Sequence, residues 1–363
     1  METYGEVHEL GNLCHESLDE KGDLKSVGSS ASVLCVRADH FLLYSAVMHG
    51  FTDSDDDRRI SEMYEQFGPT PRICFDLLSN RSRLIAYKIR CSDALEGLSF
   101  EKLRKWVSEA KKFSMDSASH TVVLLKRVSR KELKQSNLDD GDDVYLNYSC
   151  VEPLTSAVRD VLRVKLREQS RADQLQLYEH LASVEGTRCI AGLAFEALGH
   201  SKLRNKIVLK LVPMVKRESG GSDQGRKLPQ WHSDHGDGAN PSSVRQIDFT
   251  PVRTCIYSSY PHQIEDEVYY VLKARNQVAF DSFIMADQNL YIFQFTIGSN
   301  HPIKKGIVDF FLQESLPPRA NWHFVFVAPT GSRSEISCPQ SRDSGLKELM
   351  EEMKLFSAVL DPE

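Results

Sequence analysis

The chain has 363 residues, of which 41% are hydrophobic and 26% charged, a composition typical of a globular protein with room for two domains. Its formal net charge is −6, so nucleic-acid binding would depend on a local basic patch rather than on the field of the whole molecule. The eight cysteines lack the paired spacing of a zinc site, which favours reduced thiols. An acidic N-terminus without an apolar core, and no run of about 18 apolar residues, predict neither a signal peptide nor a membrane span, and therefore an intracellular protein.

The first half of the chain predicts a polar segment, residues 1–30, followed by a helix-rich domain, residues 31–183. The acidic run at 53–57 has no EF-hand ligand spacing and is interpreted as a solvated loop. The SVEGT segment interrupts the helical pattern and places the domain boundary near residues 183–187. The predicted elements are a strand at 33–44, helices at 60–68 and 100–113, a strand at 120–128 and a long amphipathic helical region at 155–183.

The second half, residues 184–363, predicts an α/β domain. It opens with a helix at 186–206, whose apolar residues recur at helical spacing and face a core. Glu196 is the polar exception on the flank of this stripe, and His200 lies one turn further on the same side. The remaining predicted elements are a loop at 219–243, strands at 252–258, 268–274, 278–286 and 290–297, a helix at 304–316, a strand at 322–329 and a terminal amphipathic helix at 346–360.

Two neighbouring strands carry acceptors where a core would favour leucine. Strict alternation in residues 290–297 places Gln294 and Thr296 on one face, opposite the aromatic residues. A turn at residues 287–289 would make 278–286 and 290–297 a hairpin, and Asp281 would then lie across from Gln294 and Thr296. A helix packed on this sheet can bring Glu196 to Asp281.

The carboxylates of Glu196 and Asp281 and the amide oxygen of Gln294 are the oxygen ligands that Mg²⁺ or Mn²⁺ prefers. Such an ion can activate water and stabilise the charge on a phosphodiester during cleavage. Lys304 or Lys305 follows the adjacent turn and would orient the water or neutralise the phosphate. The pattern predicts a metal site for phosphodiester chemistry.

Each of these residues also has a simpler interpretation. Gln294 alone is most often a hydrogen-bonded sheet residue, and Glu196 alone is most often a surface charge. Basic residues between 201 and 227 fit either a phosphate-contacting stripe or a solvated helix face. The WHSDH segment at 231–235 has two histidines without further spaced ligands and is interpreted as part of the loop.

The segments GLAFEALGH, VAFDSFI, LYIFQFTIGSNHPIKKG and WHFVFVAP resemble the PD-(D/E)xK nuclease superfamily, in particular the C-terminal domain of Crinkler and retrotransposon hot-spot proteins. The resemblance covers about 140 residues and implies a restriction-endonuclease-like αβββαβ core. It places the helical acid at Glu196, the metal-binding aspartate at Asp281 and the third motif position at Gln294. Thr296 stands where the superfamily has lysine, so Lys304 becomes the candidate substitute, with His301 nearby.

The segment EMYEQFGPTPRICFDL, residues 62–77, resembles the part of such proteins that follows a P-loop ATPase core. The phosphate-binding GxxxxGK[ST] motif is absent from this chain, so ATP hydrolysis is not expected. The resemblance implies a metal-dependent nuclease of effector type that acts on DNA rather than RNA, in the nucleus of a host cell. The alternative is a catalytically inactive nuclease fold that binds DNA or a host protein.

Overall fold

The computed structural model describes residues 58–59, 62–63, 66, 80–110, 122–127, 149–184, 186–217, 229–233, 244–257, 263–272, 279–310, 316–330 and 336–361. Internal contacts divide the chain into Met1–Val36 and Arg37–Glu363, and every described residue belongs to the second unit. The predicted strand at 33–44 and the acidic loop at 53–57 lie outside the described residues. Only residues 62, 63 and 66 of the predicted helix at 60–68 are described, and these are helical.

Helices dominate the described part of the first half. The prediction at 100–113 is confirmed by α6 (Phe100–Ala110), and the strand at 120–128 by β1 (Val123–Arg127). Two elements were not predicted: α5 (Arg81–Glu96) and β2 (Ser149–Pro153), which pairs antiparallel with β1.

The helical region predicted at 155–183 is two helices rather than one. Helix α8 (Ser156–Glu168) is capped by the Thr155 hydroxyl, and α9 (Arg171–Ser183) is capped by the Ser170 hydroxyl, which accepts from the backbone N–H of Asp173. A serine cap satisfies backbone donors that a continuous helix would satisfy itself, and so favours a new start. The chain therefore turns between the two helices.

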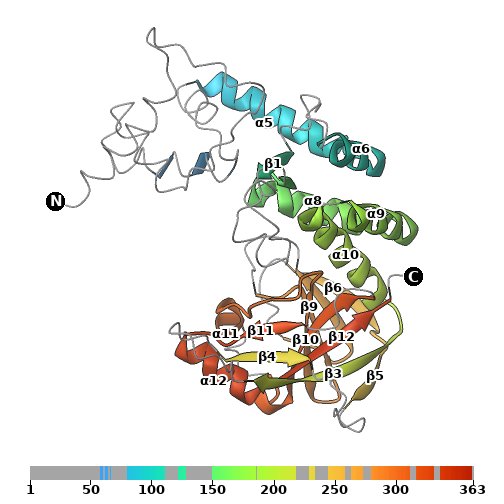
Figure 1. Ribbon diagram of the computed structural model, residues 1–363, viewed down its shortest axis with the longest axis vertical. Coiled ribbons are helices and arrows are strands. Elements are labelled where there is room, and N and C mark those ends of the chain that lie inside the picture. Colours follow the sequence, from blue (N-terminus) through green and yellow to red (C-terminus); the bar gives the residue numbers. More distant parts are fainter. Residues whose placement is uncertain are drawn as a thin grey trace, which may run out of the picture. The chain divides into compact units, whose positions relative to one another are not determined.

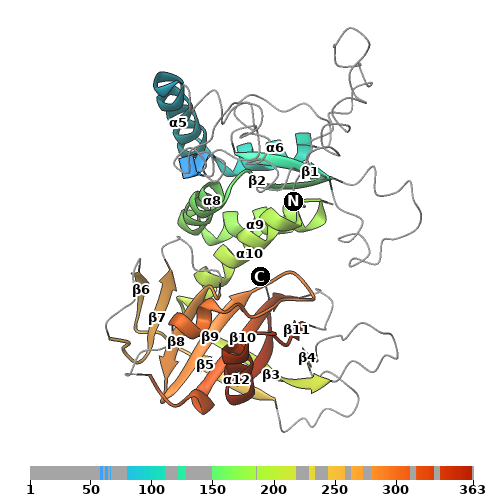
Figure 2. The same ribbon diagram turned by 90° about the vertical axis from the view of Figure 1, so that its left-hand side faces the viewer.

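Helix α10 (Arg188–Leu203) confirms the prediction at 186–206 and is the central helix of the described structure. It contacts α8 and α9 on one side and strand β9 of the sheet on the other, as Figures 1 and 2 show. Most of its residues are buried, including the polar Glu196 and His200. A helix that is buried nearly all round is apolar nearly all round, in agreement with its sequence.

Ten strands of the described residues form one mixed sheet, in the order β11-β4-β3-β12-β10-β9-β8-β7-β6, with β5 paired to β3 (Figure 1). The strands are β3 (Ile207–Arg217), β4 (Gln230–Ser233), β5 (Arg245–Phe249), β6 (Arg253–Tyr257), β7 (Val268–Leu272), β8 (Ser282–Ala286), β9 (Asn289–Phe295), β10 (Trp322–Pro329), β11 (Ser337–Pro339) and β12 (Lys354–Leu360).

The middle of the sheet is a β7-β8-β9 antiparallel meander, beside which β10 runs parallel to β9. The four predicted strands at 252–258, 268–274, 278–286 and 290–297, and the strand at 322–329, are confirmed as β6 to β10. Between β9 and β10 the chain forms α11 (Gly306–Phe310), which lies within the helix predicted at 304–316, and the short helix η3 (Arg319–Asn321). Residues 311–315 lie outside the described part.

Two predictions at the sheet edge and the chain end are wrong. The predicted loop at 219–243 contains β4, and Lys210, Lys216 and Arg217 of the basic stretch before it belong to strand β3, whereas Lys202 belongs to α10. The predicted terminal helix at 346–360 is α12 (Ser344–Glu352) followed by β12, which lies between β10 and β3. Pairing on both edges and burial of most of its residues override the helical pattern of β12.

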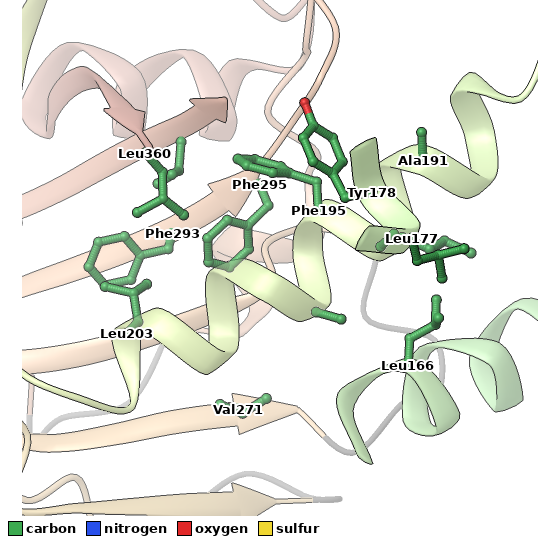
Figure 3. Close-up of a cluster of buried hydrophobic side chains, with 14 of the residues drawn as sticks. Leu166, Leu177, Tyr178, Ala191, Phe195, Leu203, Val271, Phe293, Phe295 and Leu360 are labelled. Carbon is green, nitrogen blue, oxygen red and sulfur yellow. The ribbon is translucent and has the colours of Figure 1, made fainter. Parts of the chain in front are cut away.

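Two apolar clusters lie on the two faces of the sheet. One contains α10 residues together with Tyr291, Phe293 and Phe295 of β9, and the other contains Ile292 together with residues of α12. The alternation predicted for residues 290–297 is therefore confirmed. Figure 3 shows Phe195 of α10 next to Phe295, with ring centroids 6.1 Å apart, and Leu166 and Leu177 of the neighbouring helices facing the same cluster. None of the helices in the described ranges is long and apolar enough to cross a membrane.

The two glycines of α10 allow a matched test of how closely this helix approaches the sheet. A Cβ at Gly199 would lie 2.2 Å from the ring of Phe295, whereas a Cβ at Gly192 would meet only Ile297, at 3.9 Å. Gly199→Ala should lower the free energy of unfolding by roughly 2 kcal/mol through overpacking. Gly192→Ala should raise it by up to about 1 kcal/mol through helix propensity. Urea unfolding of both variants measures the two effects, and equal signs would contradict the close approach.

His323 of β10 provides a test of stability against pH. Its side chain is 1% exposed; Nε2 lies 3.1 Å from Asn289 Oδ1, and Nδ1 is buried without a partner. Burial, with the charges of Lys354 and Arg245, lowers the pKa of His323 from 6.5 to about 4. The unfolded chain therefore binds the proton more readily, and up to about 3 kcal/mol of stability is lost as pH falls from 6.5 towards 4.

Urea unfolding between pH 7 and pH 4, compared between the wild type and His323→Gln, measures this contribution. The variant should lose less stability on acidification than the wild type. Identical losses in the two proteins would show that His323 takes up its proton without cost in the folded state.

Candidate functional site

Asp281 and Gln294 lie against each other at the start of the β8–β9 hairpin. The carboxylate oxygen Oδ2 of Asp281 accepts hydrogen bonds from Gln294 Nε2 and from the backbone N–H of Phe295, each 2.7 Å long. The backbone N–H of Asp281 donates to the carbonyl of Phe293 at 2.9 Å. The predicted juxtaposition across the two strands is therefore a direct side-chain contact.

The hairpin turn sets this register. Ala286 pairs with Asn289, so the loop consists of Asp287 and Gln288, both in the left-handed region with φ of 51° and 59°. Two successive positive φ values are typical of the tight turn whose twist matches that of paired strands. A two-residue loop fixes which residues oppose each other along the hairpin and so brings Asp281 to Gln294.

Glu196 lies on α10 and is held by two arginines of α8. Arg167 Nη2 donates to Oε1 at 2.7 Å, and Arg163 Nε donates to Oε2 at 3.1 Å. The same Arg167 also donates to the carbonyl of Leu272 at 2.7 Å. Arg163 is in addition 3.5 Å from Asp160. Both carboxylate oxygens of Glu196 are thus occupied by guanidinium donors, and α8 is tied to both α10 and the end of β7.

A buried hydrogen-bond chain continues from this ion pair. His200 Nε2 lies 3.0 Å from Arg167 Nη2, and its Nδ1 lies 2.7 Å from the Tyr269 hydroxyl, which donates to Ser282 Oγ at 2.8 Å. Burial and the charge of Arg167 lower the pKa of His200 to about 3, so the ring is neutral. The arginine then donates to Nε2, and Nδ1–H donates to the tyrosine. His200 therefore links Arg167, the partner of Glu196, to Tyr269 of the sheet.

The two acids differ in their electrostatic environment. Burial and the charge of Glu196 together raise the pKa of Asp281 to about 8, against the opposing effects of Arg163, the Phe295 N–H and Arg167. Burial also acts to raise the pKa of Glu196, but His200, Arg163 and Arg167 together hold it below its usual range. Glu196 is therefore the ionised member of the pair, and Asp281 is the acid whose charge lacks compensation.

Lys304 lies in the segment between β9 and α11 and is exposed. Burial of its ammonium group and the charges of Arg159 and Arg163 lower its pKa, and Asp281 raises it. Lys304 therefore belongs to the same group of charges as Asp281. Lys305 instead pairs with Asp343 at 3.2 Å.

Thr296 and His301 flank the site. The Thr296 hydroxyl accepts from the backbone N–H of Gly298 at 2.9 Å, within its own turn. His301 is half-buried, its Nδ1 has no hydrogen-bond partner, and burial followed by the charge of Lys304 lowers its pKa. Thr296 carries no charge, and Lys304 is a cation of this segment whose pKa the charge of Asp281 raises, so the role of Lys304 as the substitute lysine stays a prediction.

The described residues contain no group of three or more histidine, cysteine, aspartate or glutamate side chains that could hold a metal ion. The predicted ligand set contains only two carboxylates and one amide. Gln294 directs the nitrogen of its amide, Nε2, to Asp281. A divalent ion bound to Glu196 Oε2 would replace the guanidinium of Arg163. The oxygen donors fit Mg²⁺ or Mn²⁺ in kind, and their use by a metal requires Arg163 to move.

The arginines of α8 are not part of the predicted site, because they precede the predicted domain boundary near residues 183–187. Arg159, Arg163 and Arg167 are spaced four residues apart and therefore lie on one face of a helix. That spacing is a signal, but it does not indicate which acid the face meets. Trp231 and His232 of the WHSDH segment belong to strand β4.

Comparison with protein-family models, with curated proteins and with solved structures finds no match for this chain.

The ion pair of Glu196 and Arg167 should contribute more to stability than an exposed pair. Arg167→Met should lower the free energy of unfolding by about 3 kcal/mol, because a buried carboxylate loses its closest partner. Arg253→Met, which removes one partner of an exposed pair with Glu265, should cost markedly less, because water screens that pair. Urea unfolding at neutral pH measures both; similar costs would mean that Arg163 alone neutralises Glu196.

Proposed function

We propose that this chain is a metal-dependent nuclease that uses Mg²⁺ or Mn²⁺ to hydrolyse phosphodiester bonds, with DNA favoured over RNA and the nucleus as the expected place of action. The observation that carries the proposal is the Asp281 carboxyl group. Its Oδ2 accepts a hydrogen bond from Gln294 Nε2, and burial together with the charge of Glu196 raises its pKa to about 8. Buried acids with perturbed pKa values that are grouped with a second acid and a lysine are typical of catalytic sites.

The order of elements supports the same proposal. Helix α10 precedes the antiparallel β7-β8-β9 meander, α11 follows β9, and β10 then pairs parallel to β9. The resemblance to PD-(D/E)xK nucleases implies an αβββαβ order, and this chain matches it when strands β3 to β6 are treated as an insertion between α10 and β7. Asp281 and Gln294 lie at its second and third strands, where that resemblance places metal ligands.

The roles of the chain's own residues follow from the site. A bound divalent ion would supply Lewis-acid stabilisation of the phosphate and a more acidic water. Asp281, Glu196 and Gln294 would hold the ion through oxygen atoms, and Gln294 would rotate its amide to present Oε1. Lys304 would neutralise charge on the scissile phosphate. Arg163 would leave Glu196 and remain close enough to stabilise the same charge.

A second candidate is a catalytically inactive nuclease fold that binds DNA or another protein. It is favoured by the Arg163 bond to Glu196 Oε2, which satisfies the acid without a metal, and by Thr296 at the position of the superfamily lysine. The two candidates differ in one measurable property, which is cleavage that depends on a divalent ion.

Asp281→Asn tests the active candidate. Plasmid and labelled RNA are incubated with purified protein in Mg²⁺, in Mn²⁺ and in EDTA. The wild type should cut with either metal and not in EDTA, and Asp281→Asn should lose at least about a hundredfold in rate because a metal ligand and its charge are removed. Asp287→Asn, an exposed change in the turn of the same hairpin, is the matched control and should cut at the wild-type rate.

Stability separates loss of activity from loss of fold. Asn at 281 can still accept from Phe295 N–H through its carbonyl oxygen, and it removes a buried carboxylate, so Asp281→Asn should unfold at no lower urea concentration than the wild type. No metal-dependent cleavage by the wild type at any protein concentration would exclude the nuclease and leave the binding candidate.

A further inference from the structure

Three arginines form a row on one face of α8. Arg159, Arg163 and Arg167 are one helical turn apart, and the direction of their face is fixed because Arg163 and Arg167 both donate to Glu196 of α10. Arg159 continues the row by about 5 Å towards the start of the helix. The row therefore extends past Glu196 on the side of α10 and the hairpin.

Arg159 differs from the other two arginines in what it contacts. Its Nε is buried without a hydrogen-bond partner, and among the described residues no carboxylate forms an ion pair with it. A guanidinium group has five N–H donors, and a buried donor without an acceptor costs free energy. Arg159 thus holds an unsatisfied donor beside a site that already contains two satisfied arginines.

Lys304 is the second unpaired cation of this region. Within the described ranges it has no ion pair, and the charges of Arg159 and Arg163 act on its ammonium group strongly enough to lower its pKa after burial. His301, three residues earlier in the chain, has a buried Nδ1 without a hydrogen-bond partner. Cations grouped in this way repel each other unless an anion lies between them.

The local charges do not balance. Four cations, Arg159, Arg163, Arg167 and Lys304, stand against three carboxylates, Asp160, Glu196 and Asp281. Arg163 and Arg167 account for Glu196 and Asp160 through direct contacts. One positive charge remains in excess even when Asp281 is ionised, and a divalent ion would add to it.

We propose that Arg159 and Lys304, together with His301 of the segment that carries Lys304, form a subsite that binds a phosphate group of a nucleic-acid backbone beside the Glu196–Asp281 pair. A phosphodiester oxygen would accept from the free donors of Arg159 and from the ammonium group of Lys304. The inference deepens the proposed function and rests on it for the identity of the ligand. It also assigns α8, which precedes the nuclease-like core in the chain, a part in substrate binding.

The test measures binding without catalysis. Fluorescence anisotropy with labelled single-stranded and duplex DNA is recorded in EDTA over a range of KCl concentrations. The proteins are the wild type, Arg159→Gln, Arg159→Gln/Lys304→Gln, and Arg342→Gln/Lys347→Gln, a control that removes one lysine and one arginine from exposed positions at the start of α12. Inorganic phosphate and pyrophosphate are added as competitors to distinguish a backbone phosphate from a free one.

The Arg159→Gln/Lys304→Gln variant should bind DNA about tenfold more weakly than the wild type. The slope of log affinity against log salt concentration should decrease in magnitude by about one, as expected for the loss of one phosphate contact. The Arg342→Gln/Lys347→Gln control should bind within about twofold of the wild type. Neither change should lower thermal stability, because Arg159 and Lys304 have no described partner to lose.

Three results would overturn the subsite: equal DNA affinity of the variant and the wild type, an equal loss in the control, or marked destabilisation by Arg159→Gln alone, which would reveal a structural partner. Competition by free phosphate with no loss of DNA affinity in the variant would also overturn the assignment to a nucleic-acid backbone. Because EDTA is present throughout, these results are independent of cleavage. If the wild type binds DNA through this subsite but never cleaves it, the result contradicts the proposed nuclease activity and leaves the subsite in place.

Discussion

The carboxylate of Glu196 has to be neutralised, because it lies buried in the middle of a helix that is otherwise almost wholly apolar. The structure neutralises it with Arg163 and Arg167 of α8, and Arg167 is at the same time bonded to the end of β7 and in contact with His200. One buried charge therefore sets the position of α8 against α10 and of both against the sheet. The helices before residue 184 and the sheet after it share one apolar cluster around this ion pair.

The electrostatic environment of Asp281 follows from that arrangement. The two arginines direct their donors to Glu196, so Asp281 receives only an amide, one backbone N–H and the distant charges of Arg163 and Lys304. Burial and the charge of Glu196 raise its pKa, and the more distant arginines offset this only in part. A site with one satisfied and one unsatisfied acid is suited to acquire a cation, and the excess of basic groups around it is suited to acquire a phosphate. Both properties arise from how the charges are distributed.

Much of the second half of the fold was predictable because its patterns are local. The apolar stripe of α10, the alternation in β9 and the fully apolar β10 each correspond to one element. The two wrong predictions have separate causes. Residues 354–360 follow a helix and continue its apolar pattern, yet they form a strand because both edges of β12 pair with other strands. Residues 155–183 form two helices because Ser170 caps the second. The meeting of Asp281 and Gln294 was predictable from alternation and a short turn.

The sequence by itself determined the alternating strands of the hairpin, the helix that carries Glu196, and the presence of two acids and an amide on that helix and hairpin. Those features depend on side-chain periodicity within one or two neighbouring elements. Only the tertiary structure decided that Glu196 is bound by Arg163 and Arg167, that Thr296 bonds within its own turn while the charge of Asp281 acts on Lys304, and that Arg159 is left without a described partner. These outcomes depend on which charges meet after packing, and Coulomb interactions between residues far apart in the chain leave no periodic trace in the sequence.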